Sequence, residues 1–340
     1  MHAPAPHSAR ACTAPDTRQP RCSVLTTHPA PATVLFQATL GNQGGLDFLS
    51  INSAPLQLAT IMIHLTLNNH GGSVEHYYHF LLGFLAPLTL LRSQLASDRR
   101  TEICVRSCGP MDKHLITPEL NGVCILDKEL HSEMRNNKAR HNAYTFMKRR
   151  GYDNPKAYNF FDFWTISSLL FEIFHKDIAQ HLGNINANIT TNSPLIVLVN
   201  RAPPHSFYLS ESCEIKGSGA SRRSISNYTN IHEAIASEYN NVISLTLEDQ
   251  SLAFQMALFR AADIIIAQHG AALANLVWCK PNTTVVEILP LTLKKDANKN
   301  HFLMLSHCMR LEYHRIWQED KHSPVEPDLL VGTLRNVLRR

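Results

Sequence analysis

The sequence lacks long apolar runs. A membrane-spanning helix needs about 20 mostly apolar residues, whereas the two most apolar stretches, 56–67 and 80–91, are short and interrupted by polar residues or proline. No apolar segment in the first 33 residues could serve as the core of a secretory signal. We therefore expect no membrane span, and we expect the eight cysteines to be reduced thiols in a cytoplasmic protein.

The sequence also lacks an excess of one charge sign. Its 32 basic residues stand against 28 acidic ones, and the basic runs are short. Nucleic-acid binding usually requires a denser basic stripe, so we expect no nucleic-acid partner. The first 33 residues hold six prolines and a single acid, which predicts a disordered head over residues 1–33. An organelle transit peptide would share the low acid content, but the prolines disfavour the amphipathic helix that it needs.

Motifs that hold cofactors or metals are absent as well. There is no GxxxxGK[ST], and the glycine-rich run 217–222 lacks the third glycine of a dinucleotide fingerprint. Cys104 and Cys108 have no second pair with which to form a structural zinc site. The sequence also contains no Asp-x-Asp pair that could hold a metal ion against a diphosphate. We therefore expect neither a bound metal nor a cofactor.

The first half of the chain contains a few recognisable elements. Segments 61–67, 102–106 and 123–126 are typical of short buried strands. Segment 77–96 predicts a helix kinked at Pro87, and 161–181 predicts a helix ended by Gly183. The polar segment 184–193 resembles a linker. We therefore predict a domain boundary at this linker, with an N-terminal domain over 34–193 and a C-terminal domain over 194–340.

The second half alternates strands with helices. Strands are expected at 195–200, 242–247, 263–267 and 284–288, and helices at 230–238, 251–261, 271–276 and 328–337. This alternation leaves room for a crossover between successive strands, so it predicts a parallel, doubly wound sheet of the α/β class. Such sheets bind ligands outside the carboxyl ends of their strands.

Three of these strand ends carry residues suited to an anionic ligand. Arg201 follows the first strand, His269 and Gly270 follow the third, and Glu287 lies near the end of the fourth. Glycine lets a ligand approach the main chain closely. The amides of the next residues, Ala271, Ala272 and Leu273, would be free at a helix N-terminus, which favours an anion such as a diphosphate.

Side chains could complete this site. Arg201, Arg222 and Arg223 have guanidinium forks that match phosphate, and His269 can donate to a phosphate oxygen or a sugar hydroxyl. Glu287 can accept hydrogen bonds from ribose hydroxyls, as acids do in dinucleotide folds. Plainer interpretations remain open: His-Gly could be an ordinary turn, Glu287 could pair locally, and the two arginines of loop 217–226 could be solvated.

The residues as a set resemble a known family. The runs Leu-Glu-Asp at 247–249, Phe-Gln-Met-Ala-Leu-Phe at 254–259 and Ala-Asp-Ile-Ile-Ile-Ala-Gln-His-Gly-Ala-Ala-Leu-Ala-Asn at 262–275 closely resemble glycosyltransferase family 61. The likeness continues through 281–288. Upstream, 198–201 and 222–227 resemble the family's arginine-bearing segments, and Tyr-Tyr-His at 77–79 resembles its N-terminal helix. The similarity spans roughly residues 74–290.

The resemblance implies a GT-B-like fold: two Rossmann-like domains facing a cleft, with the C-terminal helix packing back. The domain over 34–193 would then be the acceptor-side domain, and the domain over 194–340 would bind the nucleotide sugar. It implies an inverting, metal-independent transferase that moves a sugar from a UDP-sugar donor, of pentose or GlcNAc type, to a glycan or polysaccharide acceptor. The donor is a substrate and not a cofactor. The donor-binding residues would be Arg201, Arg222, Arg223, Asn227, His269, Gly270, Ala271, Ala272, Asn275 and Glu287.

Inverting transfer needs a base that takes the proton of the acceptor hydroxyl. We predict His79, because the motif should place it at the cleft and because histidine titrates near neutrality. Glu75 and Asp249 remain rivals, and His79 could instead be a buried structural residue.

Three positions depart from the family pattern. His76 stands where Asn is usual, Gly83 replaces an acid, and Tyr228 follows Asn227 where Glu is frequent. The glycine keeps open a degenerate member that binds nucleotide sugar without transferring it. A nucleotide-sugar-modifying enzyme is the other alternative, although it would need the dinucleotide fingerprint that the sequence lacks.

Overall fold

The structure is a computed structural model that describes residues 39–40, 46–47, 61–65, 74–95, 101–117, 120, 123–126, 152–210 and 217–339. The chain divides into a unit of Met1–Ala32 and a unit of Thr33–Arg340, and every described residue belongs to the second unit. The head predicted to be disordered, residues 1–33, lies outside the described residues. No helix within the described ranges is long and apolar enough to cross a membrane.

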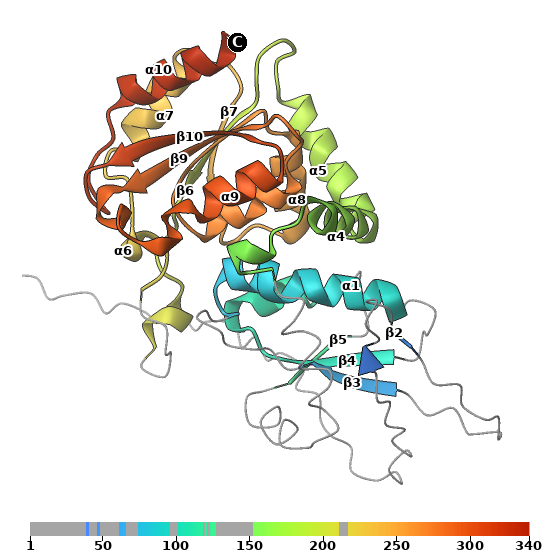
Figure 1. Cartoon of the computed structure of the whole chain (residues 1–340). Coiled ribbons are helices and arrows are strands. Elements are labelled where there is room, and N and C mark those ends of the chain that lie inside the picture. The colour runs from blue at the N-terminus through green and yellow to red at the C-terminus, as the bar shows by residue number, and fades with distance from the viewer. Residues whose placement is uncertain are drawn as a thin grey trace, which may run out of the picture. The chain divides into compact units, whose positions relative to one another are not determined.

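The C-terminal half forms a five-stranded parallel sheet in the order β10-β9-β8-β6-β7 (Figure 1). Its strands are β6 (Ile196–Asn200), β7 (Val242–Thr246), β8 (Ile264–Gln268), β9 (Thr284–Pro290) and β10 (Glu312–Gln318). Four of them were predicted. The sequence of β10, Glu-Tyr-His-Arg-Ile-Trp-Gln, is too polar to have been recognised, which suits a strand at the edge of a sheet.

Helices cover both faces of this sheet. One face packs against α7 (Tyr228–Ala236) and α10 (Pro327–Leu338) through side chains that include Ile196 and Leu198. The alternate residues of the same strand, Val197 and Val199, belong to the core that includes α8 (Leu252–Ala261) and α9 (His301–Cys308). Burial on both faces explains the continuous apolar sequence of β6. The C-terminal helix packs back onto its own sheet, beside α7.

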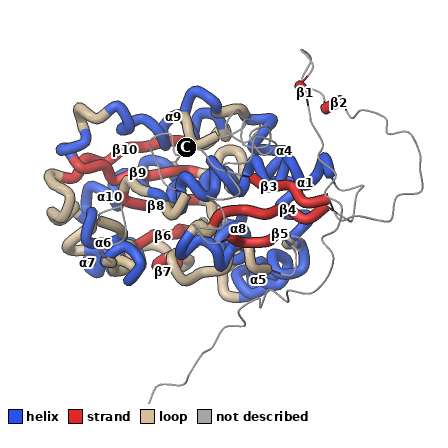
Figure 2. Tube along the Cα trace, turned by 90° about the horizontal axis from the view of Figure 1, so that it is seen from below, coloured by secondary structure: helices blue, strands red, loops and turns tan. Residues whose placement is uncertain are grey.

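The first half contains a second parallel sheet, in the order β3-β4-β5, whose strands lie side by side in Figure 2. These strands, β3 (Ile61–Leu65), β4 (Thr101–Arg106) and β5 (Val123–Leu126), are the three predicted ones. A short antiparallel pair, β1 (Thr39–Leu40) and β2 (Leu46–Asp47), precedes them. Two parallel sheets in one chain confirm the α/β, GT-B-like expectation. The domain boundary at residue 193 stays a prediction.

The predicted helix 77–96 is distorted in a specific way. It begins as a π-helical segment, η1 (His79–Leu85), and continues as α1 (Ala86–Leu95). At the junction, the Ala86 N–H donates to Leu81 O, five residues back. Pro87 has no N–H to donate, so a wide turn immediately before it lets the helix continue. His79 is therefore held in a wide turn, a geometry that often accompanies functional sites.

The predicted helix 161–181 is in fact two helices, α4 (Phe160–Ile173) and α5 (His175–Ala187). Gly183 does not end a helix, and the first residues of the predicted linker are helical. Ile178 and Ile185 of α5 are buried, and α5 packs against α8. This packing outweighs the helix-propensity cost of glycine, about 1 kcal/mol. The helix α7 also begins earlier than predicted, with Asn227 at its N-cap position.

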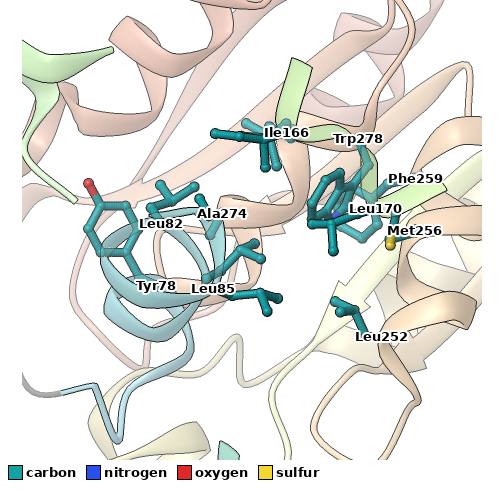
Figure 3. Packing of buried hydrophobic residues seen from close by; sticks show 14 of the residues in the cluster. Tyr78, Leu82, Leu85, Ile166, Leu170, Leu252, Met256, Phe259, Ala274 and Trp278 are labelled. Atoms are coloured by element: carbon teal, nitrogen blue, oxygen red, sulfur yellow. The ribbon is translucent and has the colours of Figure 1, made fainter. Parts of the chain in front are cut away.

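Short helical turns complete the described elements: α6 (Gly219–Arg222) and the 3₁₀ segments η2 (Gly109–His114), η5 (Pro155–Ala157), η6 (Ser206–Leu209), η7 (Ala271–Trp278), η8 (Leu291–Leu293) and η9 (Ala297–Asn300). One apolar core joins η1, α4, α8 and η7, through side chains such as Leu82, Leu170, Met256 and Trp278 (Figure 3). Because this core connects η1 to η7, residues near His79 and residues near His269 belong to one packed structure.

Candidate functional site

The strand order locates the binding edge of the larger sheet. Counted along this half of the chain, the order is 2-1-3-4-5, so connections leave the first strand, β6, in opposite directions. Ligands of such sheets bind where the order reverses, at the carboxyl ends of the first and third strands. These ends are Asn200 and Gln268, and the next residues are Arg201 and His269. The structure thus brings these two predicted site residues together.

Two arginines converge on the main chain of His269. Arg201 Nη2 and Arg223 Nη1 donate to the His269 carbonyl oxygen over 2.7 and 2.6 Å. A second nitrogen of Arg201 donates to Gly219 O, while its Nε is buried and has no partner within the described ranges. Burial, followed by neighbouring arginines, lowers the pKa of both guanidiniums to about 10. Both remain cationic at neutral pH, and their shared acceptor is neutral, so the site favours an anion.

The loop 217–226 carries Arg222 and Arg223, which differ in exposure. The plainer interpretation that both arginines are solvated is wrong for Arg223, which is only 8% exposed because its guanidinium reaches the His269 carbonyl. Arg222 is the exposed member of the pair. Burial, and after it the positive charge of Arg222, lowers the pKa of His76 to about 4. Arg222 therefore lies near His76.

Glycine is required at position 270 because the Arg201 side chain approaches its backbone closely, and not because of the backbone conformation. Its φ of 169° is extended, whereas a Cβ atom there would lie 1.8 Å from Arg201 Nη2. The following residues, Ala271 and Ala272, are partly exposed at the start of η7. The predicted third free amide is wrong, because the Leu273 N–H donates to Gly270 O at 3.0 Å. Two amides, not three, are available to an anion.

Glu287 has a different role from the one predicted. It is fully buried, accepts from His269 Nδ1 at 2.5 Å and accepts from the Tyr313 hydroxyl. Arg315 lies 3.6 Å from the same carboxylate. Such a buried group cannot receive ribose hydroxyls. Because a carboxylate only accepts, it keeps the proton on Nδ1 of His269 and orients the imidazole.

Two asparagines predicted to bind the donor make hydrogen bonds within the protein. The side-chain amide of Asn227 donates to Val325 O and accepts from Val325 N–H, which ties α7 to the segment before α10. Asn275 is fully buried, and its side chain bonds Tyr77, Gln255 and Trp278. The hydrogen bonds of both side chains therefore go to other parts of the protein, and Asn227 is partly exposed whereas Asn275 is not.

His79 reaches the same region from the first half of the chain. Its Nδ1 lies 3.1 Å from Asp153 Oδ2, and the two side chains are 24% and 27% exposed. Neighbouring Tyr78 stacks on His301, with ring centroids 5.9 Å apart. Burial and then the nearby His269 lower the pKa of His301, and His79 contributes to the same shift. The histidine from the motif, His79, and the histidine at the strand end, His269, therefore both lie near His301.

The other base candidates are less well placed. Glu75 is 6% exposed and is paired with Arg106 at 3.1 Å, so its charge is already balanced. Asp249 is exposed in the turn after β7, on the opposite side of β6 from His269.

Sequence reasoning missed His301, Phe302 and Asp153. The rings of Phe302 and His269 form an edge-to-face contact, with their centroids 5.1 Å apart. Phe302 and His301 open α9, beyond the last residue that carries the family resemblance. No local spacing signals any of the three, because each becomes relevant only through tertiary contact.

Metal-binding groups are not gathered in this part of the protein. Within the described ranges, no cluster of three or more His, Cys, Asp or Glu side chains could hold an ion. Cys108 is a free, buried thiol. Independence from metal stays a prediction.

The larger sheet is thus a doubly wound α/β sheet, and its reversal point, where ligands of such sheets bind, carries arginine cations, a glycine and the start of a helical segment. The family model for glycosyltransferase 61 matches residues 77–286, more than half of the sequence. The chain belongs to glycosyltransferase family 61.

Relatives within that family are similar over a limited segment. A β-1,2-xylosyltransferase of Oryza sativa subsp. japonica is 30% identical over 99 residues, 29% of this chain and 17% of the relative. The β-1,2-xylosyltransferase of Arabidopsis thaliana is 28% identical over 99 residues, with the same coverage. A protein O-linked-mannose β-1,4-N-acetylglucosaminyltransferase 2 of Tetraodon nigroviridis is 29% identical over 115 residues, 33% of this chain and 20% of the relative. The aligned segment is thus at most a fifth of each relative's length.

Solved structures superpose only loosely. A family 9 glycosyl transferase of Veillonella parvula gives a TM-score of 0.41 at 8% identity, covering 82% of this chain and 97% of the other. An ADP-heptose LPS heptosyltransferase II of E. coli gives 0.39 at 12% identity, covering 82% and 99%. The fold class therefore rests on the sheet topology described above.

Proposed function

We propose that this chain transfers a sugar from a UDP-sugar, of pentose or GlcNAc type, to a hydroxyl group of a glycan or polysaccharide. Transfer inverts the anomeric carbon and needs no divalent metal. The observation that carries the proposal is the pair of cationic arginines on the His269 carbonyl at the strand-order reversal. The names of similar proteins, a xylosyltransferase and an N-acetylglucosaminyltransferase, support these two donor types.

The diphosphate of the donor would lie against this cationic group. Arg222 is exposed, and the amides of Ala271 and Ala272 begin a helical segment two residues after His269, whose carbonyl binds Arg201 and Arg223. At an effective dielectric constant of 20, unit charges 4 Å apart attract by about 4 kcal/mol. Arginine cations and main-chain amides can therefore balance the charge that develops on the departing diphosphate, which a metal ion would otherwise balance.

His79 is the proposed base. Its Nδ1 faces the carboxylate of Asp153, so the other ring nitrogen, Nε2, can accept a proton. In the transfer, the acceptor oxygen forms a bond to the anomeric carbon while the bond from that carbon to the diphosphate breaks. The hydroxyl proton moves to Nε2 of His79, and the electron pair of the broken bond leaves with the diphosphate.

Ligand-induced stabilisation followed by turnover tests the proposal. In excess EDTA, UDP at 100 times its dissociation constant should stabilise the protein by about 2.7 kcal/mol. A panel of UDP-pentoses and UDP-GlcNAc, offered with oligosaccharide acceptors, should then give UDP release and a product of inverted anomeric configuration by NMR. Absence of any UDP-induced stabilisation would contradict the donor assignment. UDP binding without turnover of any donor would favour a non-transferring member of the family, and turnover that requires manganese would overturn the metal-free mechanism.

A further inference from the structure

Gly83 lies one helical turn after His79, and an aspartate fills the space where its side chain would be. A Cβ atom at Gly83 would lie 2.9 Å from Asp153 Oδ2 and 3.0 Å from Asp153 Cγ. The Asp153 carboxylate therefore rests directly on the backbone of η1. Any residue other than glycine at position 83 would push it away.

The main chain around Asp153 is held in place by η1 and its neighbours. The Tyr152 N–H donates to Leu82 O at 2.9 Å, and the Tyr78 hydroxyl donates to Asp153 O at 3.0 Å. The same hydroxyl bonds the hydroxyl of Tyr158 at 2.6 Å. These contacts place residues 152–153 along η1 independently of the Asp153 side chain, so the carboxylate is held over Gly83 by the surrounding backbone.

The Asp153 carboxylate contacts one specific ring atom of His79. Asp153 Oδ2 lies 3.1 Å from Nδ1. A carboxylate accepts and does not donate, so Nδ1 carries the proton and Nε2 keeps its lone pair. A histidine acts as a base only through a nitrogen that has a lone pair, and a carboxylate on the other nitrogen sets which one that is.

We infer that Asp153 is the positioning residue of His79 and that position 83 is glycine because the Asp153 carboxylate occupies its side-chain space. The acid expected by resemblance at position 83 is thus supplied by a segment distant in sequence. The inference rests on the proposed function of His79 as the base, and it accounts for Gly83 without loss of catalysis.

The tautomer of His79 provides a test that needs no substrate. Long-range ¹H–¹⁵N NMR spectra distinguish the Nδ1–H from the Nε2–H form, and the His79 signals are identified by their disappearance in His79→Gln. The wild-type protein should show Nδ1–H at neutral pH, and Asp153→Ala should shift the signals to a mixture of the two tautomers. The control, Asp177→Ala, removes an exposed acid from α5 and should change nothing. Unchanged His79 signals in Asp153→Ala would overturn the inference.

Glycine substitutions provide a second test with a matched control. Helix propensity favours alanine at both Gly83 and Gly183. Nothing lies within 4 Å of a Cβ atom at Gly183. Gly83→Ala should displace Asp153, reproduce the tautomer change and lower kcat at least tenfold with little change in donor KM. Gly183→Ala should leave both properties unchanged. Wild-type tautomer and kcat in a folded Gly83→Ala variant would overturn the steric part of the inference.

Combined variants separate positioning from structural damage. If Gly83→Ala acts only by moving Asp153, it should cause no further loss of kcat in the Asp153→Ala background. A fully additive loss would contradict the inference. Gly83→Asp in the Asp153→Ala background returns a carboxylate one turn from His79 and should restore the Nδ1–H tautomer. If no UDP-sugar is turned over, the proposed function fails while the NMR experiment still decides the role of Asp153.

Discussion

At the residue scale, the charge around the His269 carbonyl matters most. Burying a cation is costly unless a partner compensates it, and Arg201 and Arg223 share one neutral oxygen. The nearest acidic influences on them, Glu248 and Asp296, only partly offset burial and mutual repulsion. Folding has already desolvated these two guanidiniums, so an anion that binds them does not have to bear that desolvation cost.

Arg223→Ala should therefore weaken UDP binding at least tenfold, because a charge-assisted hydrogen bond contributes about 1.5–3 kcal/mol. Isothermal titration calorimetry measures the change. Arg335→Ala is the matched control, since Arg335 lies on α10 and pairs with Glu238 at the surface. Equal UDP affinity in the two variants would remove Arg223 from the donor site.

Gly270→Ala should weaken UDP binding as strongly as Arg201→Ala does. The added Cβ atom would lie 1.8 Å from Arg201 Nη2, so the guanidinium must move. The extended backbone of Gly270 itself tolerates alanine. In an Arg201→Ala background, Gly270→Ala should therefore have little further effect on affinity.

Gly332→Ala is the control for that experiment, because no atom lies within 4 Å of a Cβ atom at Gly332. Calorimetry and thermal unfolding of all four variants separate lost binding from lost stability. Additive losses of affinity from Gly270→Ala and Arg201→Ala would show that the glycine acts in some way other than by admitting the arginine.

At the scale of elements, the motif residues divide into those that face the site and those that hold elements together. Asn227 joins the start of α7 to Val325 by two hydrogen bonds. Asn275 joins η7 to Tyr77 and to α8.

Asn227→Ala should therefore lower stability without affecting the donor site. Two lost hydrogen bonds cost about 1–3 kcal/mol, and each kcal/mol lowers the melting temperature of a protein of this size by roughly 2–4 °C or less. Thermal unfolding and UDP titration of one preparation measure both quantities. Unchanged stability together with weaker UDP binding would return Asn227 to the donor-binding set.

At the scale of the whole molecule, stability should fall in mild acid. His114 is 3% exposed and packs against the rings of Tyr77 and Phe80. Burial, followed by the charge of Lys113, lowers its pKa from 6.5 to about 4. The unfolded chain then binds the proton more tightly than the folded protein does. The stability from neutral His114 is complete above pH 6.5 and is lost as the pH falls toward 4.

The loss at pH 4 should be up to about 3 kcal/mol, at 1.36 kcal/mol for each pKa unit. Urea unfolding at pH 7 and at pH 4 measures the difference. His114→Phe keeps the aromatic packing without a titratable group, so its stability should depend less steeply on pH over this interval. An equally steep dependence in that variant would assign the acid sensitivity to other groups, of which His76 is the next candidate.

Local pattern was enough to predict most of the second half. The strands β6, β7, β8 and β9 and the helix α8 lie within about two residues of their predicted bounds, because each is a continuous apolar or amphipathic segment. Elements whose burial depends on distant partners were less predictable. The division of α4 from α5 at Phe174, the continuation of α5 through Gly183 and the edge strand β10 depend on what each packs against.

The sequence by itself determined the alternation of strands and helices, and with it the strand ends that bear Arg201, His269 and Gly270. The pattern of apolar and polar side chains that predicts a helix or a strand lies in neighbouring residues, so these elements can be predicted from short segments of sequence. Only the tertiary structure decided the strand order, the burial of Arg223 and Glu287, and the contact of His79 with Asp153. The physical reason is that a sequence pattern records which side chains avoid water, whereas their partners are set by how the elements pack.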